Sequence, residues 1–463
     1  MRRGAAAARL LAEGAELRDV LDVGVPAAWL ELDAGVRWDQ WYYAQYILPA
    51  WEHSTGGRTL TAALRSGAPL TESQLALALC HRDGRIRGAV LGRVRSHPAL
   101  LPLLVLRCSD WAKPVRDEAR GWLGELLDAE RAATLLPLIV RVGWRQRGDF
   151  GAELADRLLR AAPRDLLTPL YTDPDREVRR FAYRLAVEQR LLSPAELACA
   201  AARDTDAVVQ SLCADAVVAA VAEGEDHDDV LAPLLGARSP QARAAGVTAL
   251  RRAGRPEQAV GFLGDRSALV RACARYVVRQ GGIDPLPWYR ERCAESDGPA
   301  PGAVIGLAEC GERGDAEVLW PLLGHPVPAV RARAVAGLRI LDVTDVRRLR
   351  PLLDDPAPAV VREVTEALLP SARTLDADWL CERLAGRWPR HVRLAAYRLL
   401  DTHEGLVRLR AAVALVDDED ARLRLSARQA VRRWFSVDRR RGTVTEVGEL
   451  LDRARQLLDA EVR

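Results

Sequence analysis

Hydrophobic and polar positions along this chain repeat with a period close to 31 residues. The marker is a small apolar residue at the start of a predicted helix, followed by arginine in nine of ten cases and by glutamine in one. The ten anchor pairs are Ile86-Arg87, Val115-Arg116, Val178-Arg179, Val209-Gln210, Ala242-Arg243, Val270-Arg271, Val330-Arg331, Val361-Arg362, Val392-Arg393 and Leu423-Arg424. Gaps of 63 and 60 residues, before Arg179 and Arg331, each hold two periods, so the array has about twelve units, two of them degenerate. Such a period is typical of solenoids, whose units are stable only when stacked.

Fixed offsets from the anchor residue predict a buried helix face in each unit. Three residues after it the side chain is nearly always small, as in Ala334 and Ala396, and seven residues after it the side chain is always apolar, as in Leu338 and Leu400. Offsets −1, +3, +6 and +7 lie on one stripe of an α-helix. The anchor therefore opens a helix whose stripe faces the core.

Turn residues precede the anchors, as in Asp173-Pro174-Asp175 and His325-Pro326. Aspartate and serine cap helix starts, and proline is tolerated in the first turn of a helix. Farther upstream lies an apolar run such as Trp320-Pro321-Leu322-Leu323. Each unit is thus predicted to be a helix, a tight turn and a second helix.

These residues resemble the HEAT-like repeats, in particular the short bacterial form related to phycobilisome-lyase repeats. Leu352-Leu353-Asp354-Asp355 with Val361-Arg362, and Leu322-Leu323 with Val330-Arg331, carry the resemblance, which covers roughly residues 75 to 435. It implies an all-α fold, an α-α superhelix of about twelve helix pairs. It indicates little about function, because HEAT-like proteins include scaffolds, regulators, lyases and nucleic-acid binders.

Three domains are expected: a helical N-terminal cap (1–75), the solenoid (76–440) and a C-terminal capping helix (441–463). The N-terminal segment is rich in aromatic residues, and one face of a predicted helix carries Trp38, Trp41, Tyr42 and Tyr46. That face either closes the apolar core or forms a patch for a partner. The anchor is lost near Gly148 and Ala300, where the chain either bends, meets a partner, or has only drifted in sequence.

Composition favours a cytoplasmic protein of a high-GC bacterial genome. Hydrophobic residues make up 49% and charged residues 28% of the chain, the formal net charge is +3, and no apolar stretch is long enough for a membrane span or signal sequence. Lys113 is the only lysine, Met1 the only methionine, and asparagine is absent. The eight scattered cysteines are expected to be reduced and largely buried.

Motifs of the common enzyme classes are missing. Lys113 follows Trp111-Ala112 and is outside any glycine-rich phosphate loop, and neither Cys-x-x-Cys nor His-Glu-x-x-His occurs. We expect no cofactor and no metal, although the acidic run at 223–229 could attract a divalent cation. Some HEAT-like proteins are DNA glycosylases with a tryptophan, aspartate and arginine cluster. Here the matching types are Trp111, Trp122, Asp117 and Arg120, but Trp122 falls at a buried offset, so this activity is not expected.

The sequence suggests instead a partly basic surface on the second helices. Offsets +4 and +8 from the anchors are expected to line the concave side, and there eight arginines stand against two carboxylates. The predicted binding residues are Arg120, Tyr183, Arg275, Arg279, Arg339, Tyr397, Arg428 and Arg432. Arginine binds carboxylate and phosphate in a two-pronged way.

Three explanations fit this arginine excess: solubility, an acidic protein or peptide partner, or nucleic acid. We expect a non-enzymatic protein–protein interaction scaffold, with nucleic-acid binding by the same stripe as the alternative. Oligomeric state cannot be inferred from the sequence.

Overall fold

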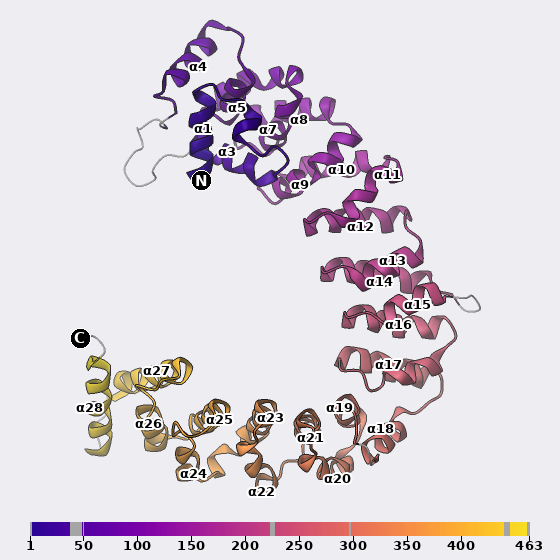
Figure 1. The fold of residues 1–463 in the computed structure, drawn as a ribbon, viewed down its shortest axis with the longest axis vertical. Helices are drawn as coiled ribbons and strands as arrows, with labels where there is room; N and C mark the ends of the chain where they lie inside the picture. Colours follow the sequence, from indigo (N-terminus) through magenta and orange to yellow (C-terminus); the bar gives the residue numbers. More distant parts are fainter. Residues whose placement is uncertain are drawn as a thin grey trace. The chain divides into compact units, whose positions relative to one another are not determined.

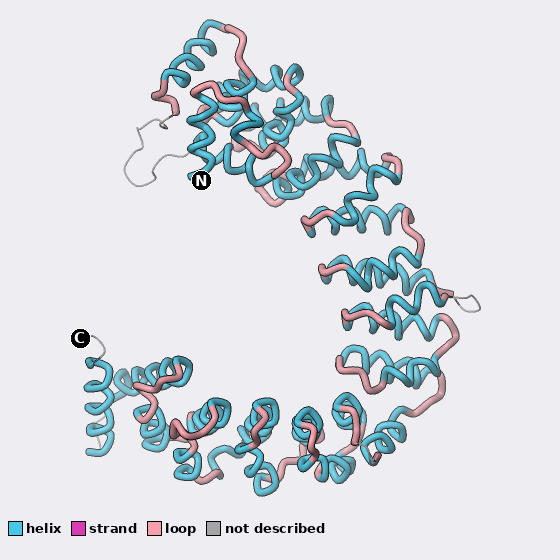
Figure 2. The backbone as a smooth tube through the Cα atoms, in the orientation of Figure 1, coloured by secondary structure: helices cyan, strands magenta, loops and turns pink. Residues whose placement is uncertain are grey.

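A computed structural model describes residues 2–37, 49, 51–222, 227–295, 298–438 and 445–460. The 463-residue chain forms two compact units, Met1–Val217 and Val218–Arg463. Throughout the described ranges the regular structure is helical, which confirms the all-α class (Figures 1 and 2). Within these ranges no helix combines the length and the apolar character that a membrane span requires.

The first unit contains α-helices and short 3-10 helices (η). They are α1 (Arg2–Ala12), α2 (Leu17–Val20), α3 (Pro26–Arg37), α4 (Thr55–Ser66), α5 (Glu72–Cys80), α6 (Gly84–Val90), η1 (Leu91–Ser96), η2 (Pro98–Leu100), α7 (Leu101–Arg107), α8 (Lys113–Leu126), α9 (Ala129–Gly143), α10 (Asp149–Arg160), α11 (Arg164–Leu167), η3 (Thr168–Thr172), α12 (Arg176–Gln189) and α13 (Pro194–Arg203). Helix α14 (Ala207–Ala220) crosses into the second unit.

The second unit continues the same alternation of first and second helices. Its helices are α15 (Asp228–Leu235), α16 (Pro240–Arg252), η4 (Pro256–Phe262), α17 (Ala268–Gln280), α18 (Pro285–Ala294), α19 (Pro301–Cys310), η5 (Arg313–Asp315), α20 (Ala316–Leu319), η6 (Pro321–Gly324), α21 (Pro328–Ile340), α22 (Val346–Leu349), η7 (Arg350–Asp354), α23 (Pro358–Leu368), η8 (Leu369–Thr374), α24 (Ala377–Glu382), α25 (Arg390–Leu400), α26 (Gly405–Val413), α27 (Ala421–Asp438) and α28 (Thr445–Ala460). Within this unit α19, α21, α23 and α25 lie on one side of the row and α18, α20, α22 and α24 on the other (Figure 1).

Proline shapes the first helix of several repeats. Pro321 and Pro351 follow a single α-turn, and the chain continues there as η6 and η7. Because proline has no N–H to donate to the preceding turn, it interrupts the α-helical hydrogen-bond series. The second helices α21 and α23 instead have Pro328 and Pro358 in their first turn, where no intrahelical donor is lost. The predicted helix, turn and helix are present.

The core positions predicted from the repeat are confirmed. Ala334 and Leu338 on α21, at offsets +3 and +7, are fully buried. A small residue is needed at +3 because helices of adjoining elements cross there. A Cβ on Gly246, at that offset in α16, would lie 2.9 Å from the Leu234 Cβ of α15.

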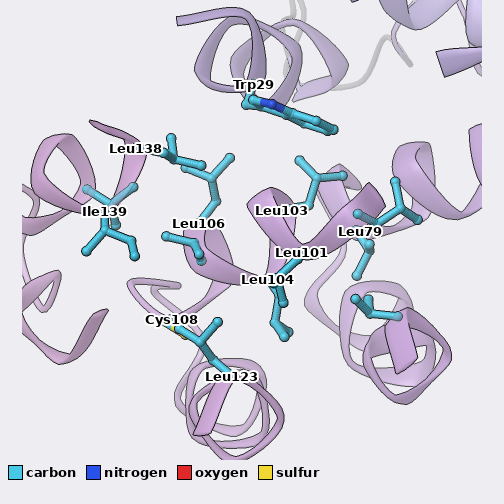
Figure 3. Close-up of a cluster of buried hydrophobic side chains, with 14 of the residues drawn as sticks. Trp29, Leu79, Leu101, Leu103, Leu104, Leu106, Cys108, Leu123, Leu138 and Ile139 are labelled. Carbon is cyan, nitrogen blue, oxygen red and sulfur yellow. The ribbon is translucent and has the colours of Figure 1, made fainter. Parts of the chain in front are cut away.

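The N-terminal segment packs into the first unit's core. Figure 3 shows Trp29 of α3 lying over the helix that carries Leu103 and Leu106. Its indole N–H donates to the Val23 carbonyl at 2.9 Å, so the buried ring has no unsatisfied donor. The predicted aromatic face of Trp38, Trp41, Tyr42 and Tyr46 lies outside the described residues.

The C-terminal helix α28 packs against α26. Leu451 and Ala454 of α28 join a small apolar cluster with Leu409 and Val413 of α26. The expected boundaries at residues 75 and 440 stay predictions, since the compact units divide the chain elsewhere.

The two degenerate repeats keep their helices. Residues near Gly148 form the turn between α9 and α10, and those near Ala300 precede α19. Gly302 allows the first turn of α19 to pack closely against the backbone at Gly264, because a Cβ on Gly302 would lie 2.0 Å from the Gly264 carbonyl oxygen. Loss of the anchor has therefore not removed the helix pair at either place.

Candidate functional site

Five of the anchor arginines join successive repeats. Arg331 of α21 donates from Nε and Nη2 to Asp355, at 2.8 and 2.9 Å, and from Nη1 to the His325 carbonyl at 2.8 Å. The same Asp355 accepts from the Ala357 N–H and so holds the next turn. Equivalent pairs are Arg87–Asp110, Arg179–Asp204, Arg243–Asp265 and Arg393–Asp418. We call this series the arginine ladder.

Sequence reasoning missed the ladder. It read the aspartates only as turn and cap residues, although they follow the anchors at a nearly constant distance, 22 to 25 residues. Nearly constant spacing between an arginine and a later aspartate was the available signal. A buried ion pair of this kind is a structural contact, so the ladder arginines are not free for a ligand.

Offset +4 is not exposed, contrary to the sequence-based expectation. Tyr183 and Tyr397 are 9% and 8% exposed, and burial raises the pKa of each to about 12. Leu91, Ala214, Val247 and Val335 at this offset are buried too. An α-helix turns by about 100° per residue, so +4 lies only about 60° from the buried +7 position. The two tyrosines are core residues and do not belong to the exposed surface.

Arginines at offset +4 are half-buried and contact the protein itself. Arg120 donates to the carbonyls of Cys108 and Arg147, at 3.1 and 2.9 Å, and its guanidinium lies over the Phe150 ring. Arg428 donates to the Val416 carbonyl at 2.8 Å. These contacts connect neighbouring elements and leave little of either side chain for a partner.

Arg275 of α17 pairs with Glu309 of α19 at 2.7 Å. Burial alone would raise the pKa of Glu309, but hydrogen bonds from Arg271 and Arg275 outweigh it and hold the pKa below its usual value. The carboxylate is therefore ionised at neutral pH and neutralises one of the two arginines that contact it.

Offset +8 does reach the surface. Arg279, Arg339 and Arg432 are exposed, and so is Arg251 of α16 at the same offset. Arg339 lies 3.7 Å from Glu363. The remaining +8 residues of the second unit include Pro370 and Asp401, so the basic run does not continue along the whole unit.

Arg251, Tyr276 and Arg279 form what we call the basic patch. Tyr276 of α17 is 50% exposed, and the Arg251 guanidinium lies 5.7 Å from the centre of its ring. Tyr276 and Arg279, with Arg275 and Glu309, border a hollow of about 370 Å³. Within the described part of the chain, neither Arg251 nor Arg279 forms an ion pair with a carboxylate.

The cysteines and the acidic run were the remaining candidates for chemistry. No group of three or more histidine, cysteine, aspartate or glutamate side chains in the described ranges could hold a metal ion, and part of the acidic run at 223–229 lies outside them. The eight cysteines are free, and burial raises the pKa of Cys108, Cys213 and Cys293 to about 12. Those three thiols stay protonated and unreactive at neutral pH.

Comparison with known proteins does not assign a family. No family model and no curated protein matches the chain. Among solved structures it is similar to importin beta (12% identity, 98% of this chain and 62% of that one, TM-score 0.30). It is also similar to Kap121p (12%, 94% and 54%, TM-score 0.34) and to Kap95p bound to RanGDP (13%, 98% and 62%, TM-score 0.33). The chain spans less than two thirds of these proteins, and scores this low carry no argument about function.

Proposed function

We propose that this chain is a non-enzymatic scaffold whose basic patch binds an acidic segment of a protein partner. The observation that carries the proposal is the group formed by Arg251, Tyr276 and Arg279. The Arg251 guanidinium lies over the exposed Tyr276 ring, and Arg279 borders the same hollow as that ring. Neither arginine has an ion-pair partner in the described structure, whereas the ladder arginines are paired. Guanidinium binds carboxylate in two-pronged fashion, and tyrosine is frequent at interface hot spots.

Helix geometry gives these arginines a structural role as well. Arg251 and Arg279 lie in the last turns of α16 and α17, where a cation interacts favourably with the helix dipole. That interaction leaves the guanidinium exposed, and it is worth about 0.3–1 kcal/mol at a surface site. It therefore does not compete with ligand binding.

Nucleic acid is the alternative ligand, since phosphate also binds arginine. A long polyanion needs cations aligned over several repeats, but Pro370 and Asp401 follow Arg339 in the same column. A short acidic segment fits the basic patch better than a duplex.

Fluorescence anisotropy with a labelled peptide rich in aspartate, glutamate and tyrosine tests the proposal. We expect the double variant Arg251→Ala/Arg279→Ala to bind this probe about tenfold more weakly, because two charge-assisted contacts are lost. Arg333→Ala is the matched control, since Arg333 is exposed on α21 outside the patch. Equal affinity of the double variant and the control would refute the proposal.

The same anisotropy measurement with duplex DNA distinguishes nucleic-acid binding from the binding of an acidic peptide. Binding that falls by about three to five decades between about 50 and 200 mM salt would show several phosphate contacts and favour nucleic acid. Absence of DNA binding at low salt would exclude it.

A further inference from the structure

A second groove lies in the first unit, apart from the basic patch. It has a volume of about 940 Å³ and is formed by the end of α9, by α10 and α12, and by the start of α14. We call it the Trp144 groove. Its lining combines charged side chains with apolar ones, among them Val140, Trp144, Val208 and Leu212.

Apolar surface in this groove is open to solvent. Trp144 is 77% exposed and Val208 is 50% exposed. Trp144 follows α9 at one of the places where the repeat loses its anchor, so no repeat position requires a large aromatic there. An exposed tryptophan beside a concave surface is typical of interface hot spots.

The rim of the groove carries more negative than positive charge. Five carboxylates and three arginines line it, a difference of two negative charges. The arginines are already held: Arg160 pairs with Asp156 and Glu188, and Arg180 pairs with Glu177 and with Asp206.

Arg184 is held between two of the same carboxylates. It lies 3.7 Å from Asp156 and 4.0 Å from Glu188. Glu153 is exposed and has no hydrogen bond or ion pair in the described part of the chain, and Asp149 is 72% exposed and 3.7 Å from Arg120. Among the carboxylates that line the groove, the one without an ion-pair partner is therefore Glu153 of α10.

We propose that the Trp144 groove binds a cationic segment of a partner protein, in which arginine or lysine residues flank an apolar side chain. The apolar side chain would pack against Val208 and Leu212 at the start of α14. A cation would lie over the Trp144 ring and beside Glu153, where cation–π attraction and charge complementarity act together. This site has the opposite charge preference to the basic patch and does not depend on it.

The probe is a short fluorescein-labelled peptide that alternates arginine with leucine. The control peptide has glutamate in place of each arginine. We expect the arginine peptide to bind and the glutamate peptide not to bind. Trp144→Ala should weaken binding by at least about tenfold, as for a hot-spot aromatic, and Glu153→Gln by about threefold.

Matched control variants are available in the same unit. Trp111 is 66% exposed and Glu125 is exposed, both outside the groove, so Trp111→Ala and Glu125→Gln should leave the affinity unchanged. Binding of both peptides with equal affinity, or equal effects of Trp144→Ala and Trp111→Ala, would overturn the proposal.

A second copy of this chain is the other candidate occupant of the Trp144 groove, and sedimentation of the full chain tests for it. Residues 421–438 are rich in arginine and could offer a cationic segment from another molecule. Concentration-dependent dimers that Trp144→Ala abolishes would assign the groove to self-association and overturn the partner proposal. A monomer that binds the arginine peptide supports it.

Discussion

At the scale of single residues, arginine in this chain has two distinct roles. Ladder arginines such as Arg331 donate to an aspartate of the next repeat and to carbonyls of their own turn. Surface arginines such as Arg279 have no such partner in the described structure. A count of arginines in the sequence cannot separate these roles, because the partner that distinguishes them lies more than twenty residues away along the chain.

A prediction at this scale concerns Asp206. Hydrogen bonds from Arg180 lower the pKa of Asp206 from its usual 3.8 to about 2. Because the folded-state pKa lies below the unfolded one, the stabilisation is complete well above the unfolded pKa and is lost as the pH falls through the folded value. We expect Asp206→Asn to lower the free energy of unfolding by about 2 kcal/mol at neutral pH, with this difference shrinking between about pH 5 and pH 2.

Urea unfolding of both proteins across this pH range measures the effect. Asp215→Asn is the control, since Asp215 is exposed on α14 and should leave the free energy of unfolding unchanged at every pH. A difference between the wild type and Asp206→Asn that does not depend on pH would contradict the assignment.

At the scale of elements, close helix crossings explain glycines that the repeat does not predict. Helices α1 and α3 touch through Gly4 and Gly35, and a Cβ on Gly35 would lie 2.1 Å from the Gly4 carbonyl carbon. We expect Gly35→Ala to destabilise the first unit by about 1–3 kcal/mol, because α1 would have to move away from α3. Thermal unfolding followed by circular dichroism measures this.

Gly121 in the same unit provides the opposite case. It lies inside α8, and a Cβ there would meet nothing within 4 Å. Gly121→Ala should therefore stabilise the protein by about 0.5–1 kcal/mol through helix propensity. The same direction of change for Gly35→Ala and Gly121→Ala would show that the crossing is not tight.

Sequence periodicity predicted most elements of the repeat, and the reasons for its failures are geometric. Core offsets +3 and +7 were predicted correctly because they depend only on the period of one helix. Offset +4 lies only about 60° from +7, and the prediction for it was wrong because neighbouring elements decide how wide the buried stripe is. Tyr183 of α12, for example, packs on Tyr171 of η3, with ring centres 5.0 Å apart. The loss of the anchor near Gly148 marked this place as one where the chain could meet a partner, but Trp144 was not named as a binding residue, because no repeat offset applies there.

At the scale of the whole molecule, contacts between neighbouring repeats hold the second unit together. The stronger contacts within the second unit join helices near one another in sequence, such as α19 with α21, α21 with α23 and α23 with α25. In such an array each repeat is stabilised mainly by its neighbours. A local defect is therefore expected to have local consequences.

Arg331→Met tests this expectation. Removing the guanidinium leaves Asp355, which is 7% exposed, without its ladder partner. Breaking a buried ion pair in this way lowers the free energy of unfolding by about 3–5 kcal/mol. Hydrogen–deuterium exchange should accelerate by about a hundredfold in α21 and α23, where the lost contact lies, while α7 and α9 of the first unit exchange as in the wild type. Arg333→Met, two positions along the same helix and exposed, should change neither region. Faster exchange throughout the chain would contradict the expectation. It would mean that all repeats unfold together, because the loss of one ion pair would then destabilise distant repeats as much as neighbouring ones.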